Sequence, residues 1–192
     1  MDNPDNGNTT NLTNQFLIAM PQLRNSYFEN TVIYMWQHNE EGALGIVVNL
    51  PTSMDLSEIF EQLEIEDIDP VVAHETVLSG GPVETDKGFI IHDEKRQYAS
   101  TFDVTDDIHV TTSRDILEDI SRGNGPGNYL VALGCSGWSP GQLEQEMADN
   151  TWLSCPAEEQ IIFNTPVEER WQAAANLIGV DLQLMSNDAG HA

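Results

Sequence analysis

The stretch LGCSGWSPGQLEQEM (residues 133–147) decides much of the fold, because it joins an apolar strand to an amphipathic helix. The run NYLVALGC, which leads into it, is typical of a buried strand. Ser139 is placed to cap a helix and Gln142 to complete a capping box, while Trp138 and Leu143 have the spacing of a hydrophobic staple. The stretch therefore predicts a buried strand that ends near the glycine-rich turn and a helix that begins at Ser139.

The same stretch places a cysteine and a serine together, which raises the question of a nucleophile. A nucleophile elbow needs the pattern G-x-S-x-G, with a histidine later in the chain. From Gly134 to Trp138 the order is Gly-Cys-Ser-Gly-Trp, so the second glycine comes one residue early, and His191 is the only histidine downstream. Cys135 also fits a small apolar residue at the end of a buried strand. We therefore expect neither Cys135 nor Ser136 to be a nucleophile, and no catalytic residue is predicted.

Residue patterns on both sides of this stretch predict paired strands with helices between them. The runs QFLIAMP, NTVIYMWQH and GALGIVVNLP are apolar at nearly every position, so we expect their sheet to be covered on both faces. Further strands are predicted at TVLSGGPV, KGFIIH, YASTFDV and DIHVTT. Four main helices are predicted to begin near Asp55, Ser113, Ser139 and Thr165. The order of elements predicts an α/β protein of the mixed α+β kind rather than a regular βαβ alternation.

The length of the chain, 192 residues, is that of one domain. We predict a disordered tail over residues 1–13, a single domain over residues 14–186 and a flexible C-terminus over residues 187–192. No signal peptide is visible, and no apolar run is long enough to cross a membrane. The two cysteines, Cys135 and Cys155, do not make a disulfide framework. These features predict a cytoplasmic protein with no membrane partner.

Charge is the most unusual property of the composition. The chain has 32 acidic and 7 basic residues, which gives a formal net charge of −25. Affinity for DNA depends on Lys and Arg side chains that neutralise phosphates, and no predicted helix has a basic face. We therefore predict no direct DNA binding. The oligomeric state does not follow from the sequence.

The histidines offer no local metal site. His38, His74, His92 and His109 lack i, i+4 spacing, His-x-His spacing and a neighbouring cysteine pair. Ligation of a metal would need residues that converge from distant parts of the chain, which the sequence does not show. No metal ligand and no cofactor are predicted.

Three segments resemble, in order and spacing, the YqgE/AlgH family of bacterial proteins. They are MPQLRNSYFENTVIYMWQHNEEGALGIVVNLP, LSGGPVETDKGFIIH and ALGCSGWSPGQLEQEMADNTWL. The resemblance runs from about Gln15 to Leu184. It implies a single domain with a curved, partly barrel-like mixed sheet surrounded by about four helices. The family carries the label of transcriptional regulator without a firmly established activity, so the resemblance implies far more about fold than about function.

The chain departs from the family pattern at several positions. Trp36, Gln37 and His38 stand where the family often has Cys-Glu-His, and Leu50 replaces an arginine. The missing arginine argues against anion binding at that turn. Cys135 stands where a tyrosine is common, which argues against a catalytic role for this position.

Three functions are compatible with a protein of this kind to different degrees. The first is a non-enzymatic regulatory or interaction domain that acts through a protein partner or a small ligand. The second is an enzyme with a site assembled near the Gly80–Gly81 and Gly137–Trp138 turns, which a pocket joining a histidine and a carboxylate would favour. The third, direct DNA binding, conflicts with the charge. We adopt the first, with a candidate groove formed by His38, Asn49, Gly80, Gly81, Pro82, Gly137, Trp138 and Gln142.

Overall fold

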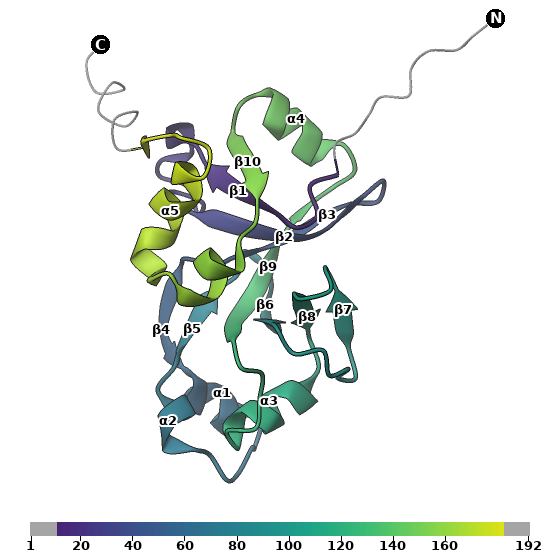
Figure 1. The fold of residues 1–192 in the computed structure, drawn as a ribbon, viewed down its shortest axis with the longest axis vertical. Helices are drawn as coiled ribbons and strands as arrows, with labels where there is room; N and C mark the ends of the chain where they lie inside the picture. The colour runs from purple at the N-terminus through teal and green to yellow at the C-terminus, as the bar shows by residue number, and fades with distance from the viewer. Residues whose placement is uncertain (1–10, 183–192) are drawn as a thin grey trace, which may run out of the picture.

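One curled sheet organises the computed structural model, which describes residues 11–182 (Figure 1). Along the sheet the strands follow the order β10 (Trp152–Pro156), β1 (Gln15–Ala19), β2 (Val32–Asn39), β3 (Gly42–Val47), β9 (Tyr129–Trp138), β6 (Val83–His92), β8 (His109–Thr111) and β7 (Thr101–Asp103). These neighbours are antiparallel, and the sheet curls into a half-barrel. β4 (Pro51–Asp55) pairs with β5 (Thr76–Ser79), which runs parallel to β9. The predicted mixed α+β fold with a partly barrel-like sheet is confirmed.

Strand β9 is the central strand of this sheet, because it pairs with three others, β3, β5 and β6. Gly80 and Gly81 follow β5 and lie between β9 and β3. The Gly80 N–H donates to the Leu133 carbonyl at 2.8 Å, and the Gly80 carbonyl accepts from the Val47 N–H at 2.8 Å. A Cβ atom on Gly81 would lie 2.0 Å from the carbonyl carbon of Cys135, so a larger residue has no room there. The two glycines therefore let three backbone segments meet where the sheet curls.

The helices cover the sheet from three sides. In chain order they are α1 (Leu56–Gln62), α2 (Pro70–Ala73), α3 (Arg114–Ser121), α4 (Gln142–Ala148) and α5 (Arg170–Asn176), with 3-10 turns η1 (Pro21–Leu23) and η3 (Val167–Glu169) and a π-helical turn η2 (Gln160–Asn164). Figure 1 shows α4 at the top, α5 at the left and α1 to α3 at the bottom. Four of the helices have seven or more residues, and these are the four that the sequence predicted.

The first two predicted helix starts are confirmed, the one at Asp55 with its capping box and the one at Ser113 in position alone. Asp55 caps α1 through its side chain, which accepts from the Ser57 N–H at 3.1 Å. Glu58 completes the capping box by accepting from the Asp55 N–H at 3.3 Å. α3 begins directly after Ser113, although the Ser113 side chain makes no capping hydrogen bond.

The other two starts are shifted toward the C-terminus. Gly141 has a φ of 78°, which is not helical, so α4 begins at Gln142 instead of the expected Ser139. Half of the predicted capping box is still present, because Gln142 accepts from the Ser139 N–H at 3.0 Å. The Thr165 hydroxyl donates to the Gln160 carbonyl at 3.0 Å rather than capping a helix, and a 3-10 turn precedes α5 at Arg170.

The sequence also misplaced the end of β9 and missed two strands. β9 continues through Ser136 and Gly137 to Trp138, because these residues pair with β3, so the expected turn starts later. β10 pairs with β1 along its whole length but is only five residues long. β4, also five residues long, contains no alternating apolar pattern.

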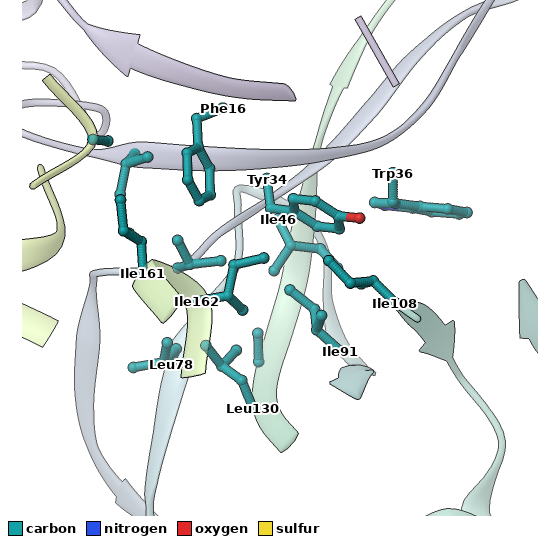
Figure 2. Packing of buried hydrophobic residues seen from close by; sticks show 14 of the residues in the cluster. Phe16, Tyr34, Trp36, Ile46, Leu78, Ile91, Ile108, Leu130, Ile161 and Ile162 are labelled. Carbon is teal, nitrogen blue, oxygen red and sulfur yellow. The ribbon is translucent and has the colours of Figure 1, made fainter. Parts of the chain in front are cut away.

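Apolar side chains fill both faces of the sheet, as the continuous apolar strands predicted. The central core lies inside the curl and includes Phe16, Tyr34, Ile46 and Leu130 (Figure 2). A second cluster on the other face of β1 to β3 is covered by α4. A third cluster packs α1 and α3 against β5, β6 and β9. Side chains that alternate along one strand therefore reach different clusters.

The ends of the described chain bear on two further predictions. Leu12 falls within the predicted tail, yet it is only 6% exposed and packs against the second face of the sheet. Residues 1–10 and 187–192, which carry the other terminal predictions, lie outside the described residues. Within residues 11–182, no helix combines the length and the apolar character that a membrane crossing needs.

Candidate functional site

A cleft of about 330 Å³ opens where the curled sheet brings β2 close to β7, and we call it the Trp36 cleft. Four strands, β3, β9, β6 and β8, separate β2 from β7 in the sheet order. The curl nevertheless brings Trp36 of β2 and Phe102 of β7 into edge-to-face contact, with ring centroids 5.2 Å apart. The cleft is lined by Trp36, Gln37, Leu44, Glu84, Lys87, Phe89, Ser100, Thr101, Phe102, Val110 and Thr112. The cleft therefore depends on the curl of the whole sheet, because its lining residues come from strands that are not neighbours in the sheet order.

Aromatic rings form the wall of the cleft. Trp36 and Phe89 belong to the central core and are 9% and 2% exposed, and their ring centroids are 6.4 Å apart. Phe102 is 40% exposed, which is unusual for so large an apolar side chain. Figure 2 shows Trp36 at one end of the core. An aromatic wall with one exposed ring is typical of pockets for small ligands.

A bulge in β6 places two opposite charges on the rim. The register between β6 and β9 shifts between Val83 and Gly88, so the intervening residues project away from the ladder. Lys87 Nζ lies 3.6 Å from Glu84 Oε1 and 5.3 Å from the centroid of the Phe89 ring. Both charged side chains are about half exposed. The rim therefore offers a cation that can leave a weak, solvent-screened ion pair to meet a ligand.

Polar groups also line the cleft. The hydroxyls of Ser100 and Thr112 lie 3.0 Å apart and can donate to or accept from a ligand. Trp36 Nε1 is buried and has no hydrogen-bond acceptor among the described residues. An unpaired buried N–H costs free energy that a new acceptor would recover. The cleft thus combines flat apolar surface with a few donors, acceptors and one cation.

None of the eight residues of the groove predicted from sequence lines this cleft. Gly80 and Gly81 are enclosed by the backbone of β9, as described above, whereas Pro82 is exposed. Gly137 packs against one lining residue, because a Cβ on it would lie 3.6 Å from Leu44 Cδ2. The two glycine turns that sequence grouped together therefore adjoin one another at β9, but they do so through packed backbone.

His38 and its partners form a separate cluster at the end of β2. His38 Nδ1 accepts from the Leu12 N–H at 3.0 Å, so its proton resides on Nε2, which lies 2.9 Å from Glu144 Oε1. The Thr13 hydroxyl accepts from the His38 N–H at 3.1 Å. A hydrogen bond within Glu144 to its own amide, and then the bond to His38, lower the pKa of this carboxyl. His38 borders a cavity of about 220 Å³ with Asn11, Asn39 and Glu40.

The remaining predicted residues make structural contacts. Trp138 Nε1 and Trp152 Nε1 both donate to Glu146 Oε2, at 2.9 and 2.8 Å, which fixes α4 against the sheet. Gln142 donates to the other Glu146 oxygen at 3.0 Å. Asn49 accepts from the Val32 N–H at 2.8 Å. The structure thus brings His38, Trp138 and Gln142 together around α4, but Asn49 lies at the opposite end of β2.

Cys135 and Ser136 have the properties of core residues. Each is 1% exposed. Burial raises the pKa of the Cys135 thiol to about 11, and the Ser136 hydroxyl donates to the Gly80 carbonyl at 3.3 Å. No histidine within residues 11–182 is hydrogen-bonded to either residue. His191, the other candidate partner, lies outside the described residues.

Two histidines that the sequence left isolated meet in the structure. His92 of β6 faces His109 of β8 across the ladder, with ring centroids 5.5 Å apart. His92 bonds to the Thr111 hydroxyl at 2.8 Å, and His109 Nδ1 lies 2.7 Å from Asp103 Oδ1. Within the described range, no group of three or more His, Cys, Asp or Glu side chains has the geometry to hold a metal ion.

Comparison with known proteins identifies the family. The family model described as AlgH-like (DUF179) matches residues 16–183. The chain belongs to the AlgH-like family. A UPF0301 protein of Thioalkalivibrio sulfidiphilus is 52% identical over 184 residues, which cover 96% of this chain and 98% of the relative. A UPF0301 protein of Ralstonia pickettii is 48% identical over 183 residues, covering 95% and 96% of the two chains.

Solved structures of AlgH-like and similar folds agree with the architecture. The solution structure of the AlgH protein from Pseudomonas aeruginosa is 43% identical, superposes with a TM-score of 0.79 and covers 100% of both chains. A crystal structure of a Corynebacterium diphtheriae protein has a TM-score of 0.70 at 16% identity and covers 97% of this chain and 94% of its own. At that identity the second likeness concerns the fold alone. The resemblance to the YqgE/AlgH family is confirmed.

The amino-acid sequence contains little that points to the cleft. Trp36 is apolar in an apolar strand, and Phe102 is a single aromatic residue in a short one. The one signal at hand was the departure from the family pattern at Trp36. Contact between β2 and β7 depends on the curl of the whole sheet, which no local pattern records.

Proposed function

We propose that this chain is a non-enzymatic binding domain whose Trp36 cleft holds a small ligand with a flat apolar body and an anionic or polar group. The observation that carries the proposal is the aromatic cleft of about 330 Å³, with Lys87 at its rim, between β2 and β7. Ligand pockets in proteins begin at about 300 Å³ and are mostly apolar with a few placed polar groups.

Each part of such a ligand has a counterpart in the cleft. The flat body would stack on Phe102, whose ring is already 40% exposed in the free protein. An anionic group would draw Lys87 Nζ away from Glu84, a half-exposed ion pair at 3.6 Å that costs little to break. A hydrogen-bond acceptor would find the hydroxyls of Ser100 and Thr112. Binding at this position would also join β2 to β7 and stiffen the half-barrel.

An enzymatic role has less support. Cys135 and Ser136 are buried, and the raised pKa of the Cys135 thiol opposes formation of the reactive thiolate. The His38–Glu144 pair is committed to holding Leu12 and α4. A regulatory role would operate through the bound ligand or a protein partner that senses it, since the net charge of −25 opposes contact with DNA. The buried free thiols of Cys135 and Cys155 support a reducing, cytoplasmic location.

The test uses anilinonaphthalene sulfonate, a flat aromatic anion whose fluorescence rises in apolar sites. We expect saturable binding with a dissociation constant of about 10–100 μM. Phe102→Ser and Lys87→Met should each weaken binding by about fivefold or more, because they remove the stacking ring and the cation.

Matched controls separate the cleft from general surface effects. Val71→Ser removes another exposed apolar side chain, and Lys95→Met removes another ion-paired lysine, and neither residue lines the cleft. These two variants should bind the probe as the unchanged protein does. Equal affinity in all five proteins, or no saturable binding to the folded protein, would overturn the proposal.

A further inference from the structure

A second pocket, of about 240 Å³, lies at the other side of the central core, and we call it the Arg170 pocket. Figure 2 shows Leu78 and Leu130, which line it, at the lower left of the core, away from Trp36. It lies between β5, β9 and the start of α5, and no residue is shared between the two linings. The residues that bear on its chemistry are Glu75, Leu78, Tyr129, Leu130, Val167 and Arg170.

Arg170 is a buried cation that forms no ion pair within the described part of the chain, although the Glu168 carboxylate acts on it from a longer distance. It is only 7% exposed, and no carboxylate among the described residues lies within 4.0 Å of its guanidinium. By contrast, Lys87, Lys95, Arg96 and Arg114 each have such a partner at the surface. The chain has 32 acidic residues, yet Arg170 forms an ion pair with none of those in the described range. Burial of a charge without an ion pair costs free energy, which a bound anion would reduce.

Two of the three guanidinium nitrogens of Arg170 are hydrogen-bonded to the described residues, and the third, Nη2, is not. Nε donates to the Thr165 carbonyl at 2.9 Å, and Nη1 donates to the Val48 carbonyl at 2.5 Å. These bonds hold the side chain in place but do not neutralise its charge, and the attraction to Glu168 is outweighed by the effect of burial. Nη2 makes no hydrogen bond to the described part of the chain and is not enclosed by it. Burial lowers the pKa of Arg170, yet an arginine side chain stays charged in proteins.

Tyr129 brings a second donor to the same pocket. Its hydroxyl is buried and makes no hydrogen bond of good geometry to the described residues, and the acceptor that it approaches is the Glu75 carboxylate. Burial, and then the hydrogen-bonding interaction with the Glu75 carboxylate, raise the pKa of Tyr129. The phenol therefore keeps its proton, and an entering carboxylate would replace Glu75 as its acceptor. The side chains of Leu78, Leu130 and Val167 add apolar surface beside these two donors.

We propose that the Arg170 pocket binds the carboxylate group of a small organic acid, between Arg170 Nη2 and the Tyr129 hydroxyl, with the apolar part of the acid against Leu78 and Leu130. One cation and one neutral donor match a single negative charge. Glu75, an exposed carboxylate on the rim, disfavours a dianion such as phosphate. The ligand class is therefore a monocarboxylic acid with a short aliphatic chain or a single ring.

The test is a titration of the isotope-labelled protein, followed by NMR, with hexanoate and benzoate. For ligands of this size we expect a dissociation constant of about 1 mM. The uncharged amides, hexanamide and benzamide, should bind about tenfold more weakly, because they lack the charge that pairs with Arg170. Chemical-shift changes should centre on Tyr129 and on the Arg170 side chain.

Four variants should change the affinity for the acids in different directions or not at all. Arg170→Met should abolish saturable binding, and Tyr129→Phe, which keeps the ring, should weaken it about threefold to tenfold. Glu75→Gln should tighten binding about twofold to fivefold by removing the opposing charge. Arg122→Met is the matched control, because it removes the same charge from another surface pocket, and it should leave binding unchanged.

Several outcomes would overturn the proposal. They are the absence of saturable acid binding, equal binding of acids and amides, and equal losses in Arg170→Met and Arg122→Met. If Arg170→Met fails to fold, the other two variants test the proposal. Tyr129→Phe should then weaken acid binding and Glu75→Gln should tighten it, and any other result would overturn the proposal. Phe102→Ser should not alter acid binding, so a negative result for the Arg170 pocket can be distinguished from a negative result for the Trp36 cleft.

Discussion

Acid should destabilise this protein through His92, and the effect can be estimated from its surroundings. His92 is fully buried in β6, and burial, followed by the nearby charge of His109, lowers its pKa from 6.5 to about 4. Between these two pH values the unfolded chain binds a proton that the folded protein excludes. The free energy of unfolding therefore falls as the pH drops from about 6.5 to about 4, and it is unaffected by His92 above that window.

The size of the effect follows from the pKa difference. At about 1.4 kcal/mol for each pH unit, the upper limit is about 3 kcal/mol. Local relaxation and water penetration reduce such penalties, so we expect a loss of about 2 kcal/mol. The carboxylates of Asp93 and Glu94 act in the opposite direction and are already part of the lowered value.

Urea unfolding at about pH 7.5 and about pH 4.5 measures this loss. His92→Phe should be less stable at both values, because the bond to the Thr111 hydroxyl is gone, but it should lose about 2 kcal/mol less than the unchanged protein between them. His74→Gln is the control, because the His74 side chain is 82% exposed, and it should keep the original slope. The same slope in His92→Phe as in the unchanged protein would refute this reasoning.

Three further predictions concern the central strand of the sheet, the candidate nucleophiles and DNA. Gly81→Ala should destabilise the fold by about 3 kcal/mol or more, or prevent folding, because its Cβ would lie 2.0 Å from the carbonyl carbon of Cys135; a urea midpoint within error of the unchanged protein would contradict this. Cys135 should resist iodoacetamide at neutral pH until the protein unfolds, since a pKa of about 11 leaves about one thiolate in 10⁴ molecules, and Ser136 should resist fluorophosphonates; rapid labelling of the folded protein would show either expectation to be wrong. The purified chain should not bind duplex DNA in low-salt anisotropy titrations, because its 7 basic residues face 32 acidic ones; micromolar binding that weakens with added salt would overturn this prediction.

Much of the fold could be predicted because its strands and helix caps are encoded locally. The apolar runs around Phe16, Tyr34 and Ile46 have side chains packed on both faces of the sheet, and Asp55 with Glu58 forms the expected capping box. The predicted start of α4 at Ser139 was wrong by three residues, because Gly141 adopts a left-handed conformation that the sequence allowed but did not demand.

The candidate site could not be predicted in the same way. Sequence reasoning grouped conspicuous residue types, such as Gly80, Gly81 and Trp138, and these serve the close packing of β9 and α4. Trp36 and Phe102 are inconspicuous in sequence and meet only because the sheet curls across four intervening strands. Long-range closure of this kind depends on the summed twist and bulges of the sheet rather than on a motif.

The indole N–H resonances of the four tryptophans test the central claim most directly, because one of them belongs to the Trp36 cleft. Trp138 and Trp152 donate to Glu146 and Trp171 donates to the Ala19 carbonyl, whereas Trp36 Nε1 has no acceptor within the described chain. During titration with anilinonaphthalene sulfonate, the Trp36 resonance should shift saturably while those of Trp138 and Trp152 stay in place. Saturable binding of the probe that leaves the Trp36 resonance unmoved, or that shifts all four equally, would contradict a ligand site in the Trp36 cleft.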